Sequence, residues 1–293
     1  MDKYEYNKKN QDEGEETSEE TITPVYVDFE DLVDFDDSEI ESCEYNLVKI
    51  LKDDKIETWL PQFNAIVDLR RLLKFRRKEF LKAFNVIYKN FVRQINSLRS
   101  SCSKISLILL YELFSSVNYD IHNEWIEAIL PTVLAKTTFI QKFIKEEAFN
   151  VLNNCSKNIF YYSVLDILVQ NIGNKNIHIS DVAFEHYNQL IQNWNYTSLL
   201  KLNDLYKIFP KIIEIYKIKK DPYSKRAIKI IGILYEKIGK QNFGDLLNKA
   251  GGEIKIQVTS ILKLANVSDK GNSDKEYEKF DIISPKKNER MKK

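Results

Sequence analysis

Thiol and imidazole groups are the side chains of this sequence best suited to catalysis or metal binding. The three cysteines, Cys43, Cys102 and Cys155, are widely separated and form no Cys-x-x-Cys pair, which argues against a zinc site. The three histidines show no metal-ligand spacing with the cysteines or with one another. His186 is in register with apolar residues, as a core histidine would be. An odd number of separated cysteines indicates reduced thiols in a cytosolic protein.

The motifs of the common enzyme classes are missing from the sequence. It contains no glycine-rich phosphate loop, no His-Glu-x-x-His and no Gly-x-Ser-x-Gly. The 44 basic and 43 acidic side chains give a net charge of +1, which provides no overall field for nucleic acid. No apolar run approaches the roughly 20 residues that a membrane-spanning helix needs. We therefore expect a cytoplasmic protein that has no catalytic activity, cofactor or metal and binds neither nucleic acid nor membrane.

Helices are the elements that must position any binding residues. Only 8 glycines and 6 prolines among 293 residues argue against an all-β fold, which needs many tight turns. Apolar residues recur at helical steps of three and four, for example over residues 80–95. A period of about forty residues that holds two helices is typical of HEAT repeats. The positions that begin or precede apolar helical stretches at this period are Trp59, Arg99, Thr138, His178 and Asp221.

We predict an all-α fold, an α-solenoid of about six HEAT-like helix pairs over residues 43–267. The acidic residues 1–42 are expected to be a mostly disordered tail. Apolar residues within 25–35 also fit a short binding motif for another protein, or a segment that folds back onto the domain. Residues 268–293 are expected to be a disordered tail with a basic end.

Two short motifs, one at a predicted turn and one in a later helix, resemble TOG domains of the CLASP and crescerin (axonemal TOG-array) type. Residues 98–103, LRSSCS, match the turn LRS-x-x-S, and residues 143–148, FIKEEA, match the helix FI-x-E-x-A. The resemblance covers about residues 43–267. It implies a flat paddle of helix pairs that binds αβ-tubulin or microtubules and regulates their dynamics. It also implies a location on the cytoskeleton and, for the axonemal branch, in a cilium or flagellum.

The turns within stacked helix pairs emerge along one edge, and the resemblance assigns tubulin contact to that edge. Most of the side chains concerned are cations, which suit an acidic partner such as tubulin. The Trp59 ring matches the aromatic residue that the family sets against β-tubulin. In chain order, the predicted contact residues are Lys55, Trp59, Leu98, Arg99, Ser100, Lys104, Lys136, Thr138, Lys142, Lys175, His178, Lys219, Lys220, Lys225 and Arg226.

Some of these assignments have a competing interpretation. Trp59 is also in register with Phe63 and Ile66, so the pattern fits a core residue as well as a contact residue. Cations are favourable at helix C-termini, but that does not account for Arg99 or Lys225, which are at predicted helix starts.

Three features depart from the family pattern. The third turn looks shortened, with no Gly or Asp between Lys136 and Phe139. Asp53 and Asp54 place acid on the first turn. The sequence contains one such unit, whereas family polymerases act as arrays or dimers. The alternative function is a HEAT-type protein scaffold without tubulin binding.

Overall fold

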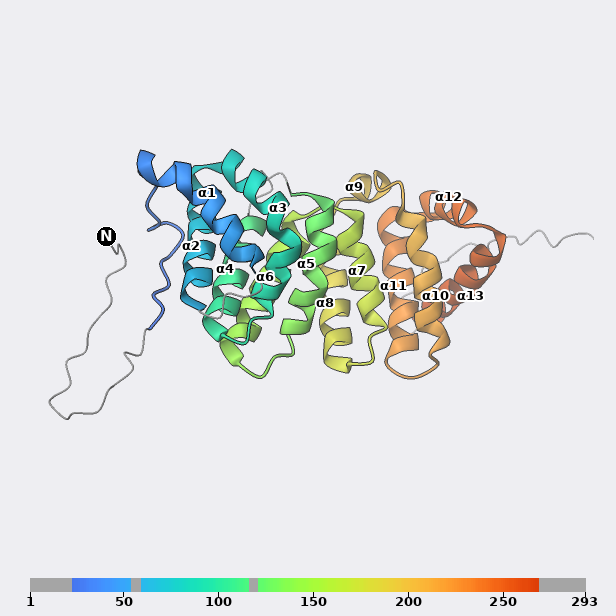
Figure 1. Ribbon diagram of the computed structural model, residues 1–293. Helices are drawn as coiled ribbons and strands as arrows, with labels where there is room; N and C mark the ends of the chain where they lie inside the picture. The colour runs from blue at the N-terminus through green and yellow to red at the C-terminus, as the bar shows by residue number, and fades with distance from the viewer. Residues whose placement is uncertain (1–22, 54–58, 116–120, 269–293) are drawn as a thin grey trace, which may run out of the picture.

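The computed structural model describes residues 23–53, 59–115 and 121–268, and the structural statements below refer to these residues. They contain thirteen α-helices, one short 3-10 helix and no strand, so the predicted all-α class is confirmed. The helices make six successive pairs. Figure 1 shows that they follow one another along the molecule. This arrangement agrees with the predicted count of about six pairs.

The helices form two layers, because each helix packs on the equivalent helix of the next pair. The first layer contains α1 (Asp37–Lys52), α3 (Arg77–Ile95), α5 (Asn123–Lys136), α7 (Tyr162–Ile172) and α10 (Ile208–Lys217). The second contains α2 (Trp59–Phe75), α4 (Ser100–Phe114), α6 (Lys142–Asn158), α8 (Ile177–Asn193), α11 (Tyr223–Ile238) and α13 (Gly252–Ser268). α12 (Lys240–Ala250) packs on α13 as the first helix of the sixth pair, and the remaining elements are α9 (Tyr196–Leu200) and η1 (Leu205–Lys207).

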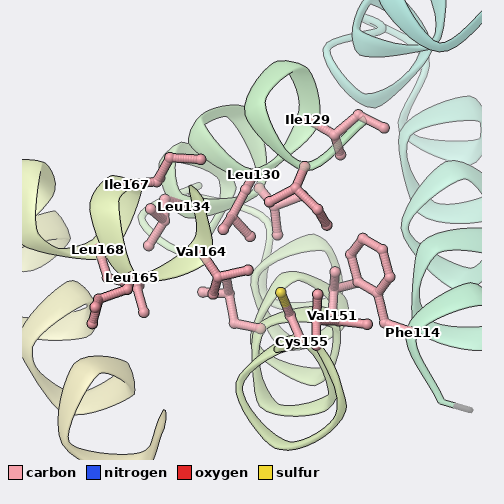
Figure 2. Close-up of a cluster of buried hydrophobic side chains, with 14 of the residues drawn as sticks. Phe114, Ile129, Leu130, Leu134, Val151, Cys155, Val164, Leu165, Ile167 and Leu168 are labelled. Atoms are coloured by element: carbon pink, nitrogen blue, oxygen red, sulfur yellow. The ribbon is translucent and has the colours of Figure 1, made fainter. Parts of the chain in front are cut away.

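The core lies between the two layers and runs along the stack. Figure 2 shows a section of it, in which Phe114 of α4, Leu130 of α5 and Val151 of α6 are buried together. Hydrogen bonds also link equivalent positions of neighbouring pairs. Trp125 Nε1–H donates to Asn85 Oδ1 at 3.0 Å, across forty residues of sequence. The sequence period of about forty residues is thus the step from one helix pair to the next.

Residues 23–36, which we call the N-terminal strap, lie along α2 in the structure (Figure 1, dark blue). Leu32 and Phe35 are buried in the core. Arg70 Nη2–H donates to the Val27 carbonyl at 2.8 Å, and Lys74 Nζ–H donates to the Glu30 carbonyl at 2.6 Å. The apolar residues within 25–35 fitted either a binding motif for another protein or a segment that folds back onto the domain. The structure shows a segment that folds back.

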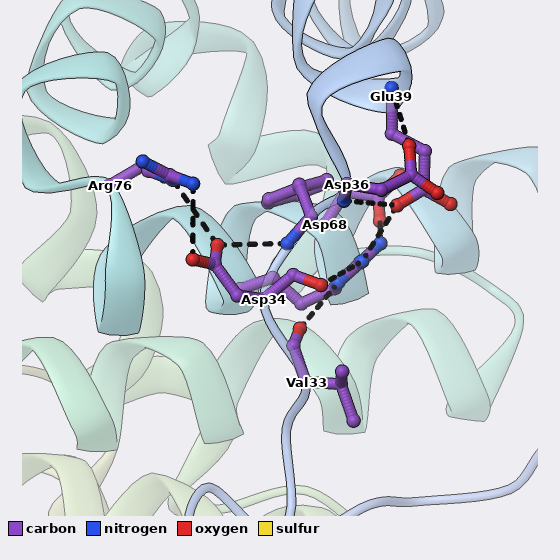
Figure 3. A network of polar contacts seen from close by, with 8 residues as sticks. Val33, Asp34, Asp36, Glu39, Asp68 and Arg76 are labelled. Atoms are coloured by element: carbon purple, nitrogen blue, oxygen red, sulfur yellow. Dashed lines mark hydrogen bonds and ion pairs between the residues drawn. The ribbon is translucent and has the colours of Figure 1, made fainter.

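The far end of the strap leads into α1 through a polar network (Figure 3). The Asp34 carboxylate lies 3.1 Å from the Arg76 guanidinium. Asp36 accepts from the Glu39 N–H at 3.0 Å and the Glu39 carboxylate accepts from the Asp36 N–H at 3.2 Å, a capping box that starts α1 at Asp37. The strap and this cap thus hold residues on the stack that precede the expected domain start at residue 43. At the other end α13 runs to Ser268.

Candidate functional site: the turn edge

The turns within four helix pairs lie along one side of the stack, the lower edge in Figure 1. They are residues 96–99, 137–141, 173–176 and 218–222, which follow α3, α5, α7 and α10. We call these turns and the first residues of the helices that follow them the turn edge. Trp59 starts α2 at this edge, whereas Lys55 falls outside the residues that the structure describes.

Hydroxyl groups tie the turns to the helix ends in a repeated way. Ser103 Oγ–H donates to the Ile95 carbonyl at 2.7 Å, and Ser180 Oγ–H donates to the Ile172 carbonyl at 2.5 Å. In both cases a serine in the second helix satisfies a carbonyl at the C-terminal end of the first helix, eight residues earlier. The last serine of the LRSSCS motif is therefore a structural residue that fixes the path of the second turn.

Apolar side chains of the turn edge project into solvent, from the turns themselves or from the first residues of the helices that follow. Leu98 and Ile140, on neighbouring turns, have relative accessibilities of 103% and 99%, so neither packs on the stack. Further exposed apolar residues of this edge are Phe139, Phe143, Ile177 and Ile218. Single exposed apolar residues are common, but a row of them along one edge marks an interaction surface.

Most of the predicted cations of the turn edge are exposed beside these apolar side chains. Arg99 follows Leu98 directly, and Lys142 lies two residues after Ile140. Lys142 is 3.5 Å from Glu146, and Lys225 is 2.6 Å from Asp221, both as exposed pairs four residues apart. Such pairs contribute little and are open to exchange with a partner. The other exposed members of the predicted set are Lys175, His178, Lys219 and Lys220.

Lys136 is not part of the exposed edge, contrary to the sequence prediction. It is the last residue of α5 and only 5% exposed. Its Nζ lies 4.3 Å from the centroid of the Phe139 ring, because the third turn folds over the lysine stem. Burial also lowers the pKa of this ammonium group. A partner at the turn edge would therefore meet Phe139 at this position.

Arg226 is the second predicted contact residue that the structure assigns to the interior. It is 9% exposed, and its Nη1–H donates to Ser180 Oγ at 2.5 Å. Its Nη2 pairs with the Asp181 carboxylate. The guanidinium thereby clamps α11 to α8. Arg226 directly follows the exposed Lys225 in the sequence, but its side chain lies on a different face of the helix.

The remaining predicted residues are only partly accessible. Trp59 is half-buried with its ring edge-on to Phe63 at 6.0 Å, so it is part of the packed first repeat as well as of its edge. The Lys104 ammonium lies 4.3 Å from the Tyr26 ring of the strap. Ser100 begins α4, and Thr138 Oγ1–H donates to the Ala135 carbonyl at 2.9 Å.

The third turn is not shortened, which corrects the prediction made from its lack of Gly and Asp. Thr137 and Thr138 form the tight reversal, and α6 begins only at Lys142. The turn consequently spans residues 137–141 and includes Ile140, whose apolar character instead suggests a position in the helix. Phe139 and Phe143 also escaped the sequence analysis, because apolar residues beside a helix start look like core residues.

Two of the thiols and one imidazole of the described residues, those of Cys102, Cys155 and His186, are buried. The part of the chain that the structure describes contains no group of three His, Cys, Asp or Glu side chains that could hold a metal ion. Burial raises the pKa of Cys102 to about 11 and that of Cys155 to about 12, so neither thiol is a ready nucleophile. His186 is buried beside Ser156, as a core histidine. No helix in the ranges that the structure covers is long and apolar enough to cross a membrane.

Comparison with known proteins identifies a sequence family. The family model described as "CLASP N terminal" matches residues 45–222, more than half of the chain. The predicted resemblance to CLASP-type domains is thereby confirmed, whereas the crescerin branch stays a prediction. No protein in the comparison with curated sequences matches the chain.

Solved structures with similar folds are distant in sequence. "TOG domain structure from C.elegans Zyg9" is 15% identical with a TM-score of 0.49, covering 82% of this chain and 91% of that one. "Structural Basis of Microtubule Plus End Tracking by XMAP215, CLIP-170 and EB1" is 13% identical with a TM-score of 0.47, covering 81% and 95%. "TOG-tubulin binding specificity promotes microtubule dynamics and mitotic spindle formation" is 12% identical with a TM-score of 0.47, covering 80% and 89%. No function follows from likenesses this distant.

Proposed function

The chain belongs to the CLASP N-terminal family, and from this premise we propose that it binds αβ-tubulin or the microtubule lattice through its turn edge. In this proposal it acts without catalysis, as a regulator of microtubule dynamics located on the cytoskeleton. Imaging of the protein in cells would test the more specialised location, the cilium. The observation that carries the proposal is that successive turns, each taken with the start of the helix that follows, combine an exposed apolar side chain with an exposed cation.

The chemistry of the turn edge suits a large acidic protein partner. Leu98 and Ile140 stand clear of the stack, so a partner surface can bury them without any rearrangement of the protein. Arg99 and Lys142 beside them can steer an acidic partner and fix its register. The turns themselves are held by hydrogen bonds such as that from Ser103 to Ile95, which reduces the entropy lost on binding.

The decisive test removes the apolar contacts and leaves the charges in place. We expect the double variant Leu98→Ala/Ile140→Ala to bind microtubules about thirtyfold more weakly, since a central anchor pair is typically worth about 2 kcal/mol or more. Its thermal stability should not change, because both side chains are already exposed in the free protein. Cosedimentation with microtubules and gel filtration with free tubulin would measure the effect and separate the two forms of partner.

A matched control removes two exposed apolar side chains away from the turn edge. Tyr45 on α1 and Val86 on α3 are 70% and 47% exposed, and neither is near a turn of this edge. The variant Tyr45→Ala/Val86→Ala should bind within about twofold of wild type. Equal binding by wild type and both double variants would reject the turn edge as the tubulin site. Absence of binding by the wild type would leave a protein scaffold with another partner.

A further inference from the structure

The N-terminal strap starts at the turn edge and runs away from it. Near its beginning, the Tyr26 ring lies edge-on to Phe63 with 5.7 Å between centroids, and Lys104 Nζ lies 4.3 Å from the same ring. Phe63 and Lys104 are close to the N-terminal ends of α2 and α4, which start at this edge. The strap then passes along α2 to Arg76, beyond the opposite end of that helix. The first described residues of the strap therefore lie beside the turn edge.

Main-chain contacts also hold the strap along α2. Arg70 and Lys74 of α2 donate to strap carbonyls at 2.8 and 2.6 Å, and Arg71 Nε–H donates to the Val33 carbonyl at 3.0 Å. Buried Leu32 and Phe35 add an apolar attachment to the core. The strap is thus held to the stack at several points along its length.

The sequence just before the strap is complementary in charge to that edge. Residues 12–20, DEGEETSEE, contain six carboxylates and no cation. An extended chain covers at most about 3.3–3.6 Å per residue, so Glu20 can lie up to about 10 Å and Asp12 up to about 36 Å from Thr23. Neighbouring helices are about 8–10 Å apart, so this acidic run can span the second, third and fourth turns. Those turns expose Arg99, Lys142 and Lys175.

We propose that the acidic run, residues 12–20, docks on the exposed cations of its own turn edge and competes there with an acidic partner. The docking stands on the strap geometry and the charges, whereas the competition rests on the proposed function. Individual exposed ion pairs are weak, but a short tether gives an effective concentration in the millimolar range, so several weak pairs suffice. Added salt should release the run, because these charges are screened over about 8–10 Å.

Docking can be tested in the full chain without tubulin. A zero-length carboxyl-to-amine crosslinker, followed by mass spectrometry, should join acids of residues 12–20 to Lys142 and Lys175 at low salt. The yield should fall several-fold in 0.5 M salt, in proportion to the screening. Lys157 is exposed at the far end of α6 and is the control acceptor. Crosslinks to Lys157 as frequent as those to Lys142 would overturn the docking.

Competition can be tested with a variant that neutralises the run and keeps the strap. We expect Asp12→Asn with Glu13, Glu15, Glu16, Glu19 and Glu20 each changed to Gln to bind microtubules about threefold to tenfold more tightly at low salt, with the difference lost at high salt. A control with Asp274→Asn, Glu276→Gln, Glu278→Gln and Asp281→Asn neutralises four carboxylates at the other end of the sequence, against six in the test variant.

The two tests have separable outcomes. If the neutralised variant binds no more tightly than the wild type, or if the control gains as much, the competition is wrong. If neither the wild type nor the neutralised variant binds tubulin, the proposed function fails and the crosslinks alone decide the docking.

Discussion

Arginine has opposite roles in two regions of this molecule, the turn edge and the face of α2 under the strap. Arg99 is exposed at the second turn. Arg70 is 1% exposed, and its Nε–H donates to both carboxylate oxygens of Glu112, at 3.0 and 2.9 Å. The strap carbonyl of Val27 accepts from the same guanidinium. A cation that the chain itself buries stabilises the fold, whereas a solvent-exposed cation can bind a partner.

The difference between the regions predicts where substitutions act. Removing one member of a buried ion pair leaves a charge without its partner in a poorly hydrated place, so the folded state loses stability. Removing an exposed cation changes the surface field, so the association rate and its salt dependence change while the fold does not. The same chemical change at Arg70 and at Arg99 should therefore give different phenotypes.

The largest effect is expected at Arg70. Arg70→Met keeps the side-chain volume but leaves Glu112 buried without its partner, which typically costs about 3–5 kcal/mol of unfolding free energy. Urea unfolding monitored by circular dichroism would measure it. Arg99→Met is the matched control and should change stability by less than about 0.5 kcal/mol.

A second variant separates the ion pair from packing. In Arg70→Met/Glu112→Leu no charge is left unpaired, so most of the lost stability should return. A single Arg70→Met variant as stable as Arg99→Met would show that the buried pair does not support the strap face.

The next effect concerns the two histidines of α8. Burial lowers the pKa of His186 from its ordinary value of 6.5 to about 4, so the folded state favours the neutral imidazole. Between these values the unfolded chain binds a proton that the folded chain does not. Stability should therefore fall as the pH drops from about 6.5 to about 4, by about 3 kcal/mol, and then level off.

Unfolding curves at several pH values would isolate this contribution. The difference in stability between wild type and His186→Gln should change by about 3 kcal/mol between pH 7 and pH 4. His178→Gln, at the exposed start of the same helix, should follow the wild type throughout. Parallel curves for wild type and His186→Gln would mean that His186 takes up its proton in the folded state.

The period of about forty residues and the apolar spacing were enough to predict the helix pairs, the edge formed by their turns and the core position of His186. The strap could not be predicted this way, because α2 holds it through main-chain carbonyls, which every sequence has. Its one clear signal was the apolar pair Leu32 and Phe35 in an otherwise acidic segment.

The site residues were predicted less well than the fold for a geometric reason. One residue along a helix is a rotation of about 100°, so a cation and its neighbour can face solvent and core respectively. Lys136 was misplaced because the turn after α5 folds back over it. Ile140 was missed because the start of α6 lies two residues beyond it, which apolar spacing alone does not reveal.

The smallest and most specific contrast is between the neighbours Arg226 and Lys225. Arg226→Met removes a hydrogen bond to Ser180 and the pair with Asp181, and bonds to charged groups are worth about 1.5–3 kcal/mol. Lys225→Met removes only the exposed pair with Asp221, worth about 0.3–0.5 kcal/mol. Urea unfolding should therefore rank the two variants clearly.

Microtubule binding should rank these two variants in the opposite order. At a temperature where both are folded, Lys225→Met should weaken cosedimentation at low salt, because it removes a steering charge from the turn edge. Arg226→Met should bind like wild type, because the guanidinium it removes is turned toward α8. The opposite result would be a loss of affinity in Arg226→Met, at unchanged stability, with no loss in Lys225→Met. The partner would then contact the face between α8 and α11, and the assignment of Arg226 as a structural cation and Lys225 as a binding cation would be wrong.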